Sequence, residues 1–348
     1  MRILFSGGGT LGSVTPLIAI AQEIRKRQPQ AEFLWLGTRN GPEISIVSRY
    51  DIPFKKIFSG KLRRYFSWQN FLDPFHILFG FFQALSTIAK FKPSVVMTAG
   101  GYVAVPVVWA AWLLRCPVTI HQEDVRPSIT NKLTARFATT VTVTFQKSLA
   151  DFPKGKTSWI GNPVRADIFS GSIDTARSFF SLEPNTPTVL VVGGGTGAQA
   201  LNDVIVKALP LLLAHCQIIH VTGGKGTVAA PHPRYHRYDF LTDELKDAYA
   251  VSDVVVSRGG MSTLTELAAL RKAVVIAPIP GTHQMDNANE FFKNNASLVI
   301  NERDMTPEQC ASVILEAVTD MATRQNLSRN IGKLLPDGAA EKIASMIL

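Results

Sequence analysis

The residues TVLVVGGGTGA, Thr188 to Ala198, decide the fold. A short apolar run is followed by glycines, and an apolar-periodic helical segment then begins near residue 201. The residues RILFSGGGTLG, Arg2 to Gly12, repeat this order, and another such helical segment follows over residues 16–24. A strand, a glycine-rich turn and a helix, present twice about half a chain apart, predict a duplicated Rossmann-like plan.

Further strand-like runs alternate with helix-like segments at Phe33–Leu36, Val95–Thr98, Val118–His121, Thr140–Thr144, Ile218–Val221, Val254–Ser257 and Ala273–Ala277. This alternation predicts parallel sheets joined by crossover helices. A boundary is expected near Asn162-Pro163, because Asn-Pro favours a turn. We therefore expect an N-terminal domain over 1–162, a C-terminal domain over 163–330, and a last helix over 331–348 that packs back toward the N-terminal domain.

Composition narrows the class of protein. Of 348 residues, 46% are hydrophobic and 18% are charged, which is typical of a packed globular chain. The net charge of +9 would attract nucleic acid, an anionic membrane or a phosphorylated substrate. No nucleic-acid-binding motif, secretory signal or membrane-spanning apolar stretch is found in the sequence. The cysteines Cys116, Cys216 and Cys310 match no metal or redox spacing and are expected to be buried thiols.

Both glycine loops have the spacing of a phosphate-binding turn, Gly7-x-Gly9-x-x-Gly12 and Gly193-x-Gly195-x-x-Ala198. Tight turns that bind nothing are the plain alternative. An NAD-dependent enzyme needs an acidic residue after the second strand of each motif, and neither motif has one. Arg39 could face a 2′-phosphate, so an NADP-dependent oxidoreductase stays open.

A third glycine-containing turn follows the strand Val254–Ser257 and reads Arg258-Gly-Gly-Met-Ser-Thr-Leu-Thr-Glu266. Glu266 falls on the first turns of the helix that follows, so it could cap that helix or accept hydrogen bonds from both hydroxyls of a ribose. The later segment Pro278–Ala288 is a polar loop that leads into a helix. Its amides and its imidazole suit the hydroxyls of a sugar.

These motifs, in this order, resemble the MurG family of N-acetylglucosaminyltransferases in the GT-B superfamily. The resemblance extends from the first strand to the last helix, and its motifs are Gly8–Thr10, Gly100–Val103 with Pro106, His121 with Thr130–Lys132, Gly161–Arg165, Gly193–Ala198 with Leu201-Asn202, Arg258–Glu266, and His283-Gln284 with Asn287-Ala288. It implies two Rossmann-like domains whose parallel sheets face each other across a cleft, and a UDP-N-acetylglucosamine donor held mainly by the C-terminal domain.

The resemblance also implies roles for single residues. Glu266 would bind the ribose, Leu241 would border the uracil, Arg165 would reach the phosphates, and Gln284 would contact the sugar. The full set of implied donor-binding residues is Thr10, Gly12, Asp124, Arg165, Gly195, Leu241, Met261, Ser262, Thr263, Leu264, Thr265, Glu266, His283, Gln284 and Asn287. The implied acceptor-binding residues are Gly8, Gly9, Thr10, Gly101, Tyr102 and Asn131.

The first glycine loop departs from the family pattern. The family reads Gly-Gly-Thr-Gly-Gly-His, whereas this chain has Leu11, Gly12 and Ser13 after Thr10. A serine is no base near neutral pH without help. The catalytic candidates are therefore Asp124, Glu123 and Ser13, and His121 is either catalytic or a satisfied histidine at a strand end. No cofactor is implied, and no Asp-x-Asp pair occurs to hold a metal ion.

The segment Lys55–Lys92 combines basic residues with many aromatic ones. Such a segment suits the surface of an anionic membrane, and a core helix beside a basic loop is the alternative. With the implied lipid-linked acceptor, it predicts a cytoplasmic enzyme, peripheral on the inner face of the cell membrane.

The resemblance therefore implies an inverting hexosyltransferase that moves N-acetylglucosamine from its UDP donor to a lipid I type acceptor in peptidoglycan precursor synthesis. Alternatives are a GT-B transferase for another acceptor, a UDP-sugar epimerase and a catalytically impaired relative.

Overall fold

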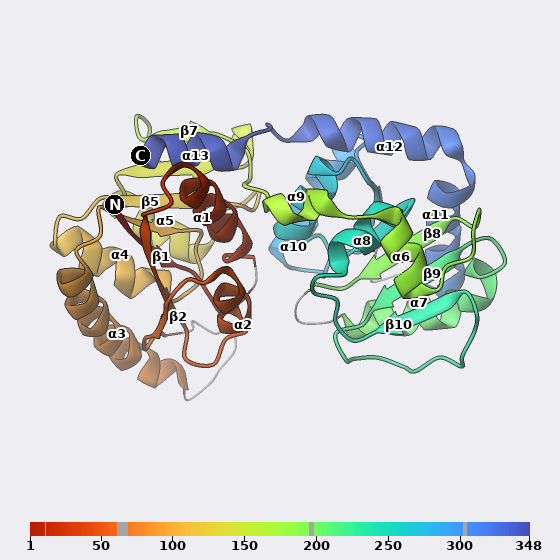
Figure 1. Cartoon of the computed structure of the whole chain (residues 1–348), viewed down its shortest axis with the longest axis horizontal. Helices are drawn as coiled ribbons and strands as arrows, with labels where there is room; N and C mark the ends of the chain where they lie inside the picture. Colours follow the sequence, from red (N-terminus) through yellow and green to blue (C-terminus); the bar gives the residue numbers. More distant parts are fainter. Residues whose placement is uncertain (11, 61–68, 195–197, 302–304) are drawn as a thin grey trace. The chain divides into compact units, whose positions relative to one another are not determined.

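The computed structural model divides into two units (Figure 1). The N-terminal unit comprises Met1–Arg165 together with Pro336–Leu348, and the C-terminal unit comprises Ala166–Leu335. The structure describes all residues except 11, 61–68, 195–197 and 302–304, and it describes residues 69–72 by their backbone alone. The chain changes unit after Arg165 and returns at Pro336, whereas the boundaries were expected after residues 162 and 330.

The N-terminal unit contains a parallel sheet of order β3-β2-β1-β4-β5-β6-β7. Its strands are β1 Arg2–Ser6, β2 Glu32–Gly37, β3 Phe54–Lys56, β4 Val95–Thr98, β5 Val118–Gln122, β6 Thr140–Val143 and β7 Thr157–Trp159. Its α-helices are α1 Thr15–Arg27, α2 Glu43–Val47, α3 Gln69–Phe91, α4 Ala104–Leu113, α5 Ile129–Thr134 and α13 Ala339–Ile347, with short 3₁₀ helices at Ser48–Tyr50, Ala135–Phe137 and Gln146–Asp151.

Helices cover both faces of this sheet because successive strand residues point to opposite sides. Ile3 and Phe5 of β1 pack with α1 and α13 in one cluster of buried residues. Leu4, between them, belongs to a second cluster with α3 and α4. The central strand β4 is buried along its whole length, as a strand covered on both faces is, whereas the edge strand β3 is largely exposed.

The C-terminal unit contains a parallel sheet of order β10-β9-β8-β11-β12-β13. Its strands are β8 Thr188–Val192, β9 Gln217–Val221, β10 Tyr235–Tyr238, β11 Val254–Ser257, β12 Ala273–Ile276 and β13 Leu298–Val299. Its helices are α6 Ile173–Phe180, α7 Gln199–Leu212, α8 Leu245–Val251, α9 Met261–Ala269, α10 His283–Lys293, α11 Pro307–Thr319 and α12 Met321–Leu334, after a 3₁₀ helix at Ala166–Ser170.

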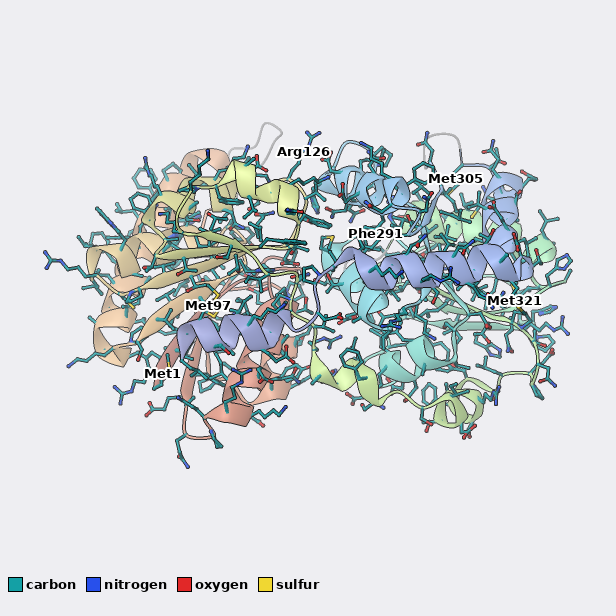
Figure 2. All side chains as sticks on the ribbon, turned by 90° about the horizontal axis from the view of Figure 1, so that it is seen from above. Met1, Met97, Arg126, Phe291, Met305 and Met321 are labelled. Carbon is teal, nitrogen blue, oxygen red and sulfur yellow. The ribbon has the colours of Figure 1, made fainter. Side chains whose placement is uncertain are left out.

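One face of this second sheet is covered by α7 and α11, whose apolar residues share a cluster with Val189 and Val191 of β8. Side chains fill the interior of each unit, as at Met97 and Phe291, which are fully buried (Figure 2). The two parallel sheets with crossover helices confirm the predicted α/β architecture.

Candidate functional site

The order of the strands in each sheet predicts where a ligand binds. In an open parallel sheet, ligands bind at the carboxyl ends of the strands, where the strand order reverses. That point lies between β8 and β11 in the C-terminal unit and between β1 and β4 in the N-terminal unit. The glycine loops after β1 and β8 and the turn after β11, all predicted from sequence, lie at these points.

The turn after β11 is shaped by Gly259, which has a φ of +86°. A side chain there would also meet Ile276 at 3.1 Å. Asn287, fully buried on α10, donates a hydrogen bond of 3.1 Å to the carbonyl oxygen of Gly259. Asn287, predicted to contact the donor, therefore supports this turn from beneath.

Helix α9 begins after Gly260, whose backbone is extended and which supplies no side-chain cap. The first amides of an α-helix have no partner within the helix and favour an anion. A side chain added at Gly260 would meet none of the described atoms within 4 Å. Of the predicted residues on this turn, Ser262 and Thr263 are half-buried, whereas Met261, Leu264 and Thr265 are buried. The space beside Gly260, where the helix starts, is therefore open.

The carboxylate of Glu266 lies on the second turn of α9 and is 5% exposed. The hydroxyl of Tyr249, on α8, donates a hydrogen bond of 3.2 Å to Oε2 of Glu266. A neighbouring helix therefore fixes the orientation of this carboxylate.

The glycine loop after β8 is closely packed at its base. A side chain at Gly193 would overlap Ala198. Gly194 has a φ of +83° and open space beside it, and Gly195, predicted to bind the donor, lies outside the described residues. Asn202, fully buried on α7, donates to the carbonyl oxygens of Thr222 at 2.9 Å and Lys225 at 3.1 Å, which joins this loop region to the end of β9.

Three further predicted donor residues lie on neighbouring loops of the C-terminal unit. His283, at the start of α10, is exposed. Gln284 is half-buried, and its Oε1 accepts a hydrogen bond of 3.1 Å from the amide of Ile279. Leu241 is half-buried after β10, beside Phe240, which is 65% exposed.

In the N-terminal unit, the loop after β1 packs against the loop after β4. A side chain at Gly101, whose φ is +80°, would overlap the carbonyl oxygen of Gly8. A side chain at Gly9, whose φ is +85°, would overlap the ring of Tyr102. The predicted acceptor residues of these two loops therefore pack directly against each other. The close contacts require glycine at positions 9 and 101.

The amides of this glycine loop are used inside the protein. The amide of Gly8 donates to Oγ of Ser13 at 3.1 Å, and the amide of Gly9 donates to Oε2 of Glu43 at 3.2 Å. Ser13, a catalytic candidate, is 5% exposed and acts here as a support for the loop. Glu43, fully buried on α2, was missed by the sequence reasoning because nothing local distinguishes it from a surface acid.

The predicted residues Thr10, Gly12 and Glu123 come together. A side chain added at Gly12 would lie 3.8 Å from Oγ1 of Thr10 and 3.9 Å from Oε2 of Glu123. Thr10 is exposed, Glu123 is 6% exposed, and Asp124 is half-buried. Two carboxylates therefore follow β5, and that of Glu123 lies close to the first glycine loop.

The side chains of Asn131 and Gln122 form hydrogen bonds with the backbone on both sides of these carboxylates. Nδ2 of Asn131 donates to the carbonyl oxygen of His121 at 3.2 Å and to Oε1 of Gln122 at 2.7 Å. Nε2 of Gln122 then donates to the carbonyl oxygens of Asp124 at 2.9 Å and Arg126 at 3.1 Å. Asn131, predicted to bind the acceptor, is 2% exposed and lies beneath the site.

His121 is fully buried at the end of β5. Its Nε2 lies 2.7 Å from Oδ1 of Asn162 and its Nδ1 lies 2.9 Å from Oγ1 of Thr142. Burial lowers the pKa of His121 from 6.5 to about 4, against a smaller opposing effect of the Asn162 hydrogen bond. A neutral imidazole therefore donates to Asn162 and accepts from Thr142, which favours the satisfied histidine over the catalytic one.

Arg165 is the last residue of the first segment of the N-terminal unit and is half-buried. Its Nη1 donates a hydrogen bond of 3.3 Å to the hydroxyl of Tyr50. Its predicted contact with the donor phosphates stays a prediction.

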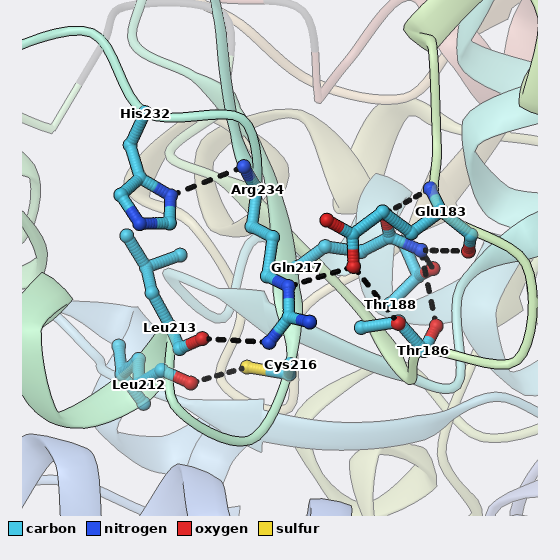
Figure 3. A network of polar contacts seen from close by, with 9 residues as sticks. All are labelled: Glu183, Thr186, Thr188, Leu212, Leu213, Cys216, Gln217, His232 and Arg234. Atoms are coloured by element: carbon cyan, nitrogen blue, oxygen red, sulfur yellow. Dashed lines mark hydrogen bonds and ion pairs between the residues drawn. The ribbon is translucent and has the colours of Figure 1, made fainter.

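A cavity of about 380 Å³ opens at the opposite, amino end of the second sheet, lined by residues that include Asp253 and Lys272. Its charged groups bind the protein itself: Lys272 donates to the carbonyl oxygens of Ala250 and Ser252, and Asp253 accepts from the amide of Thr188. Figure 3 shows the adjoining network, in which Gln217 joins Glu183, Thr186 and Thr188. The hydrogen bonds at this end of the sheet hold the loops together, and the switch point lies at the opposite end of the strands.

Within the described part of the chain, no group of three or more His, Cys, Asp or Glu side chains is arranged to hold a metal ion.

Comparison with known proteins supports this arrangement. Residues 3–143 match the glycosyltransferase family 28 N-terminal domain, and residues 188–342 match the family 28 C-terminal domain. A relative from Clostridium perfringens, named UDP-N-acetylglucosamine--N-acetylmuramyl-(pentapeptide) pyrophosphoryl-undecaprenol N-acetylglucosamine transferase, is 34% identical over 340 residues, 96% of this chain and 93% of the relative. A relative of the same name from Lachnospira eligens is 34% identical and covers 99% of this chain and 98% of its own length.

Among solved structures, the crystal structure of Acinetobacter baumannii MurG superposes with a TM-score of 0.74 at 25% identity, over 99% of this chain and 98% of that one. These matches confirm the resemblance to the MurG family that the sequence motifs indicated.

Proposed function

This chain belongs to glycosyltransferase family 28, and we propose on that premise that it transfers N-acetylglucosamine from UDP-N-acetylglucosamine to a pyrophosphoryl-undecaprenol-linked N-acetylmuramyl-pentapeptide. The observation that carries the proposal is the switch point of the C-terminal unit, where α9 begins after Gly260 without a side-chain cap, the space beside Gly260 is open, and Glu266 follows on the second turn. A nucleoside diphosphate has the matching parts, an anionic diphosphate and a ribose with two adjacent hydroxyls.

In the reaction, an acceptor hydroxyl attacks the anomeric carbon of the donor sugar. The new bond joins that oxygen to the anomeric carbon, the bond between this carbon and the UDP oxygen breaks, and UDP leaves with the electron pair. A base must take the hydroxyl proton, and positive potential must stabilise the leaving diphosphate. The amides at the start of α9 suit the second task.

For the base we propose Asp124. Glu123 lies near Gly12 of the first glycine loop and is 6% exposed, whereas Asp124, the next residue, is half-buried. A base has to reach a hydroxyl that arrives from solvent, which favours the more accessible carboxylate. Ser13 is not assigned the role because its oxygen accepts the amide of Gly8.

The lipid-linked acceptor requires access to a membrane surface, and we propose that α3 docks there. Phe75, Leu78, Phe79 and Phe82 form the apolar face of α3, with exposed fractions of 61%, 52%, 60% and 56%. Their spacing places them on one side of the helix, while Ala84 and Ile88 on the other side are buried in the core.

The end of α4 carries a second group of exposed apolar residues. Trp112, Leu113 and Leu114 are exposed there and are followed by the exposed Arg115. Lys56, Lys90 and Lys92 are also exposed, whereas Lys61, Arg63 and Arg64 of the predicted basic segment lie outside the described residues. Aromatic and basic side chains together favour the interface of an anionic membrane. Within the described part of the chain, no helix has the length and apolar character to cross a bilayer.

The experiment is a calorimetric titration with UDP-N-acetylglucosamine and other UDP-sugars, followed by turnover of the best donor on a short-chain lipid I analogue. We expect preferential binding of UDP-N-acetylglucosamine and release of UDP that depends on the acceptor. Donor binding without transfer would indicate the catalytically impaired relative, and acceptor-independent isomerisation of the donor would indicate an epimerase. Absence of donor binding would contradict the proposal.

A further inference from the structure

Glu43 is a fully buried carboxylate next to the first glycine loop. It follows the turn after β2 and is the first residue of α2. Its Oε1 accepts from the amide of Thr38 at 2.7 Å and from the hydroxyl of Thr38, and its Oε2 accepts from the amide of Gly9 at 3.2 Å. One carboxylate therefore joins the loop after β1 to the loop after β2.

Glycines from separate segments make room for this side chain. A side chain at Gly8 or at Gly41 would overlap the carboxyl group of Glu43, and one at Gly37 would lie 3.3 Å from its Oε1. Burying a carboxylate costs free energy unless hydrogen bonds compensate for the lost hydration. The enclosed carboxylate of Glu43 has such donors, so the surrounding loops are arranged to accommodate it.

This contact decides which parts of the loop can meet a ligand. The amide of Gly9 points inward to Glu43 and that of Gly8 points inward to Ser13, so neither faces outward as an anion-binding amide does. Thr10, the next residue, is exposed. The glycines therefore support the loop from inside, and contact with the acceptor is left to Thr10.

We propose that Glu43 is a positioning residue of the acceptor site. It holds Gly8 and Gly9 in one conformation, which fixes the place of Thr10 and the packing of the loop on Tyr102. The inference rests on the proposed transferase function, because it assigns Glu43 to the acceptor side of that reaction.

The test compares Glu43→Gln with the wild-type enzyme in steady-state kinetics. Glutamine keeps the shape, but its NH₂ group replaces an acceptor and would face the amide of Gly9 or Thr38. We expect the KM for a lipid I analogue to rise about tenfold, the scale of one lost charged hydrogen bond, and the KM for UDP-N-acetylglucosamine to stay within about twofold. Glu43→Asp, which is too short to span both loops, is measured in its place if the glutamine variant does not fold.

The matched control is Asp247→Asn in the C-terminal unit. Asp247 is also a buried acid, 5% exposed, and accepts from the amide of Ser172 at 2.7 Å. Equal changes of both KM values in the Glu43 variant, or an acceptor KM that changes no more than in Asp247→Asn, would overturn the proposal.

Hydrogen exchange separates this inference from the proposed function. In Glu43→Gln the amides of residues 7–13 should exchange faster, with the loop after β11 unchanged. A wild-type enzyme that transfers nothing to lipid I would contradict the proposed function, and exchange in this peptide would still decide the role of Glu43. Unchanged exchange there would contradict it.

Discussion

The hydroxyl of Tyr249 lies 3.2 Å from Oε2 of Glu266, and this hydrogen bond joins α8 to α9 behind the switch point of the second sheet. Tyr249 is 1% exposed and cannot move without disturbing the core. The carboxylate is therefore oriented before any ligand arrives, which lowers the entropic cost of binding.

If Glu266 binds the ribose, Glu266→Ala should lose about 2–4 kcal/mol of UDP affinity, because ligand hydroxyls would be left without partners. Tyr249→Phe, which removes only the orienting hydrogen bond, should lose about 1 kcal/mol. Calorimetry with UDP measures both. An affinity unchanged by Glu266→Ala would disprove the ribose assignment.

Gly260 offers a test of the open space in front of α9. Its backbone is in the extended region that any residue adopts, so Gly260→Asp should fold and can cap the helix, with a melting temperature equal to or slightly above the wild-type value. The new carboxylate would occupy the place proposed for the diphosphate, and UDP affinity should fall at least about tenfold. Normal UDP binding by a stable Gly260→Asp variant would place the diphosphate elsewhere.

Asp124→Asn should lower kcat about 100-fold or more, the scale of a lost general base, while the KM for the donor changes little. Glu123→Gln is the matched variant, since it changes the neighbouring carboxylate in the same way. Full activity of Asp124→Asn together with loss of activity in Glu123→Gln would transfer the role to Glu123.

The apolar face of α3 predicts binding to anionic vesicles. Each large side chain buried in the interface contributes about 1.5–3 kcal/mol, so a Leu78→Glu, Phe82→Glu double variant should lose at least about tenfold in co-sedimentation. The same substitutions at Val228 and Phe179, which are 70% and 50% exposed on the C-terminal unit, are the control. Equal loss in both double variants would mean that charge, and not this face, governs binding.

His121 predicts how stability depends on pH. The unfolded chain binds a proton on this imidazole below about pH 6.5, whereas the folded protein, with its pKa lowered to about 4, does not. Stability is therefore fully present above pH 6.5 and decreases as the pH falls toward 4, by up to about 3 kcal/mol from this group.

Urea denaturation at a series of pH values measures this effect. All five tryptophans lie in the N-terminal unit, so their fluorescence reports the unit that contains His121. His121→Gln should flatten the decrease between pH 6.5 and 4, and His215→Gln, which changes an exposed histidine of the other unit, should not. A decrease of the same slope in His121→Gln would mean that this imidazole is not the group responsible.

The central strands were predictable from the sequence because they are buried on both faces and read as continuous apolar runs, as in β8 and β11. The edge strands β3 and β7 were missed because each is short and partly polar. Each also pairs with a neighbouring strand on one side only. Their β-structure depends on a neighbouring strand, and no local pattern records that.

At the site, the glycine loops and Glu266 were predictable because glycine spacing and a helix start are local features. The role of Glu43 was not, because its burial depends on Gly8, Gly37 and Gly41, and glycine spacing gives no sign of the side chain that it accommodates. The environment of His121 likewise depends on Thr142 and Asn162, which follow it at a distance in the chain.

Helix α13 follows the whole C-terminal unit in the chain but completes the N-terminal unit. Ile343 and Ala344 are fully buried in the same cluster as Ile3, Phe5 and Leu17. During synthesis, the first sheet must therefore keep this apolar surface uncovered while the whole second unit emerges from the ribosome. A stop codon after Leu335 would therefore damage the N-terminal unit, and an isolated N-terminal unit would have to be produced with residues 336–348 attached.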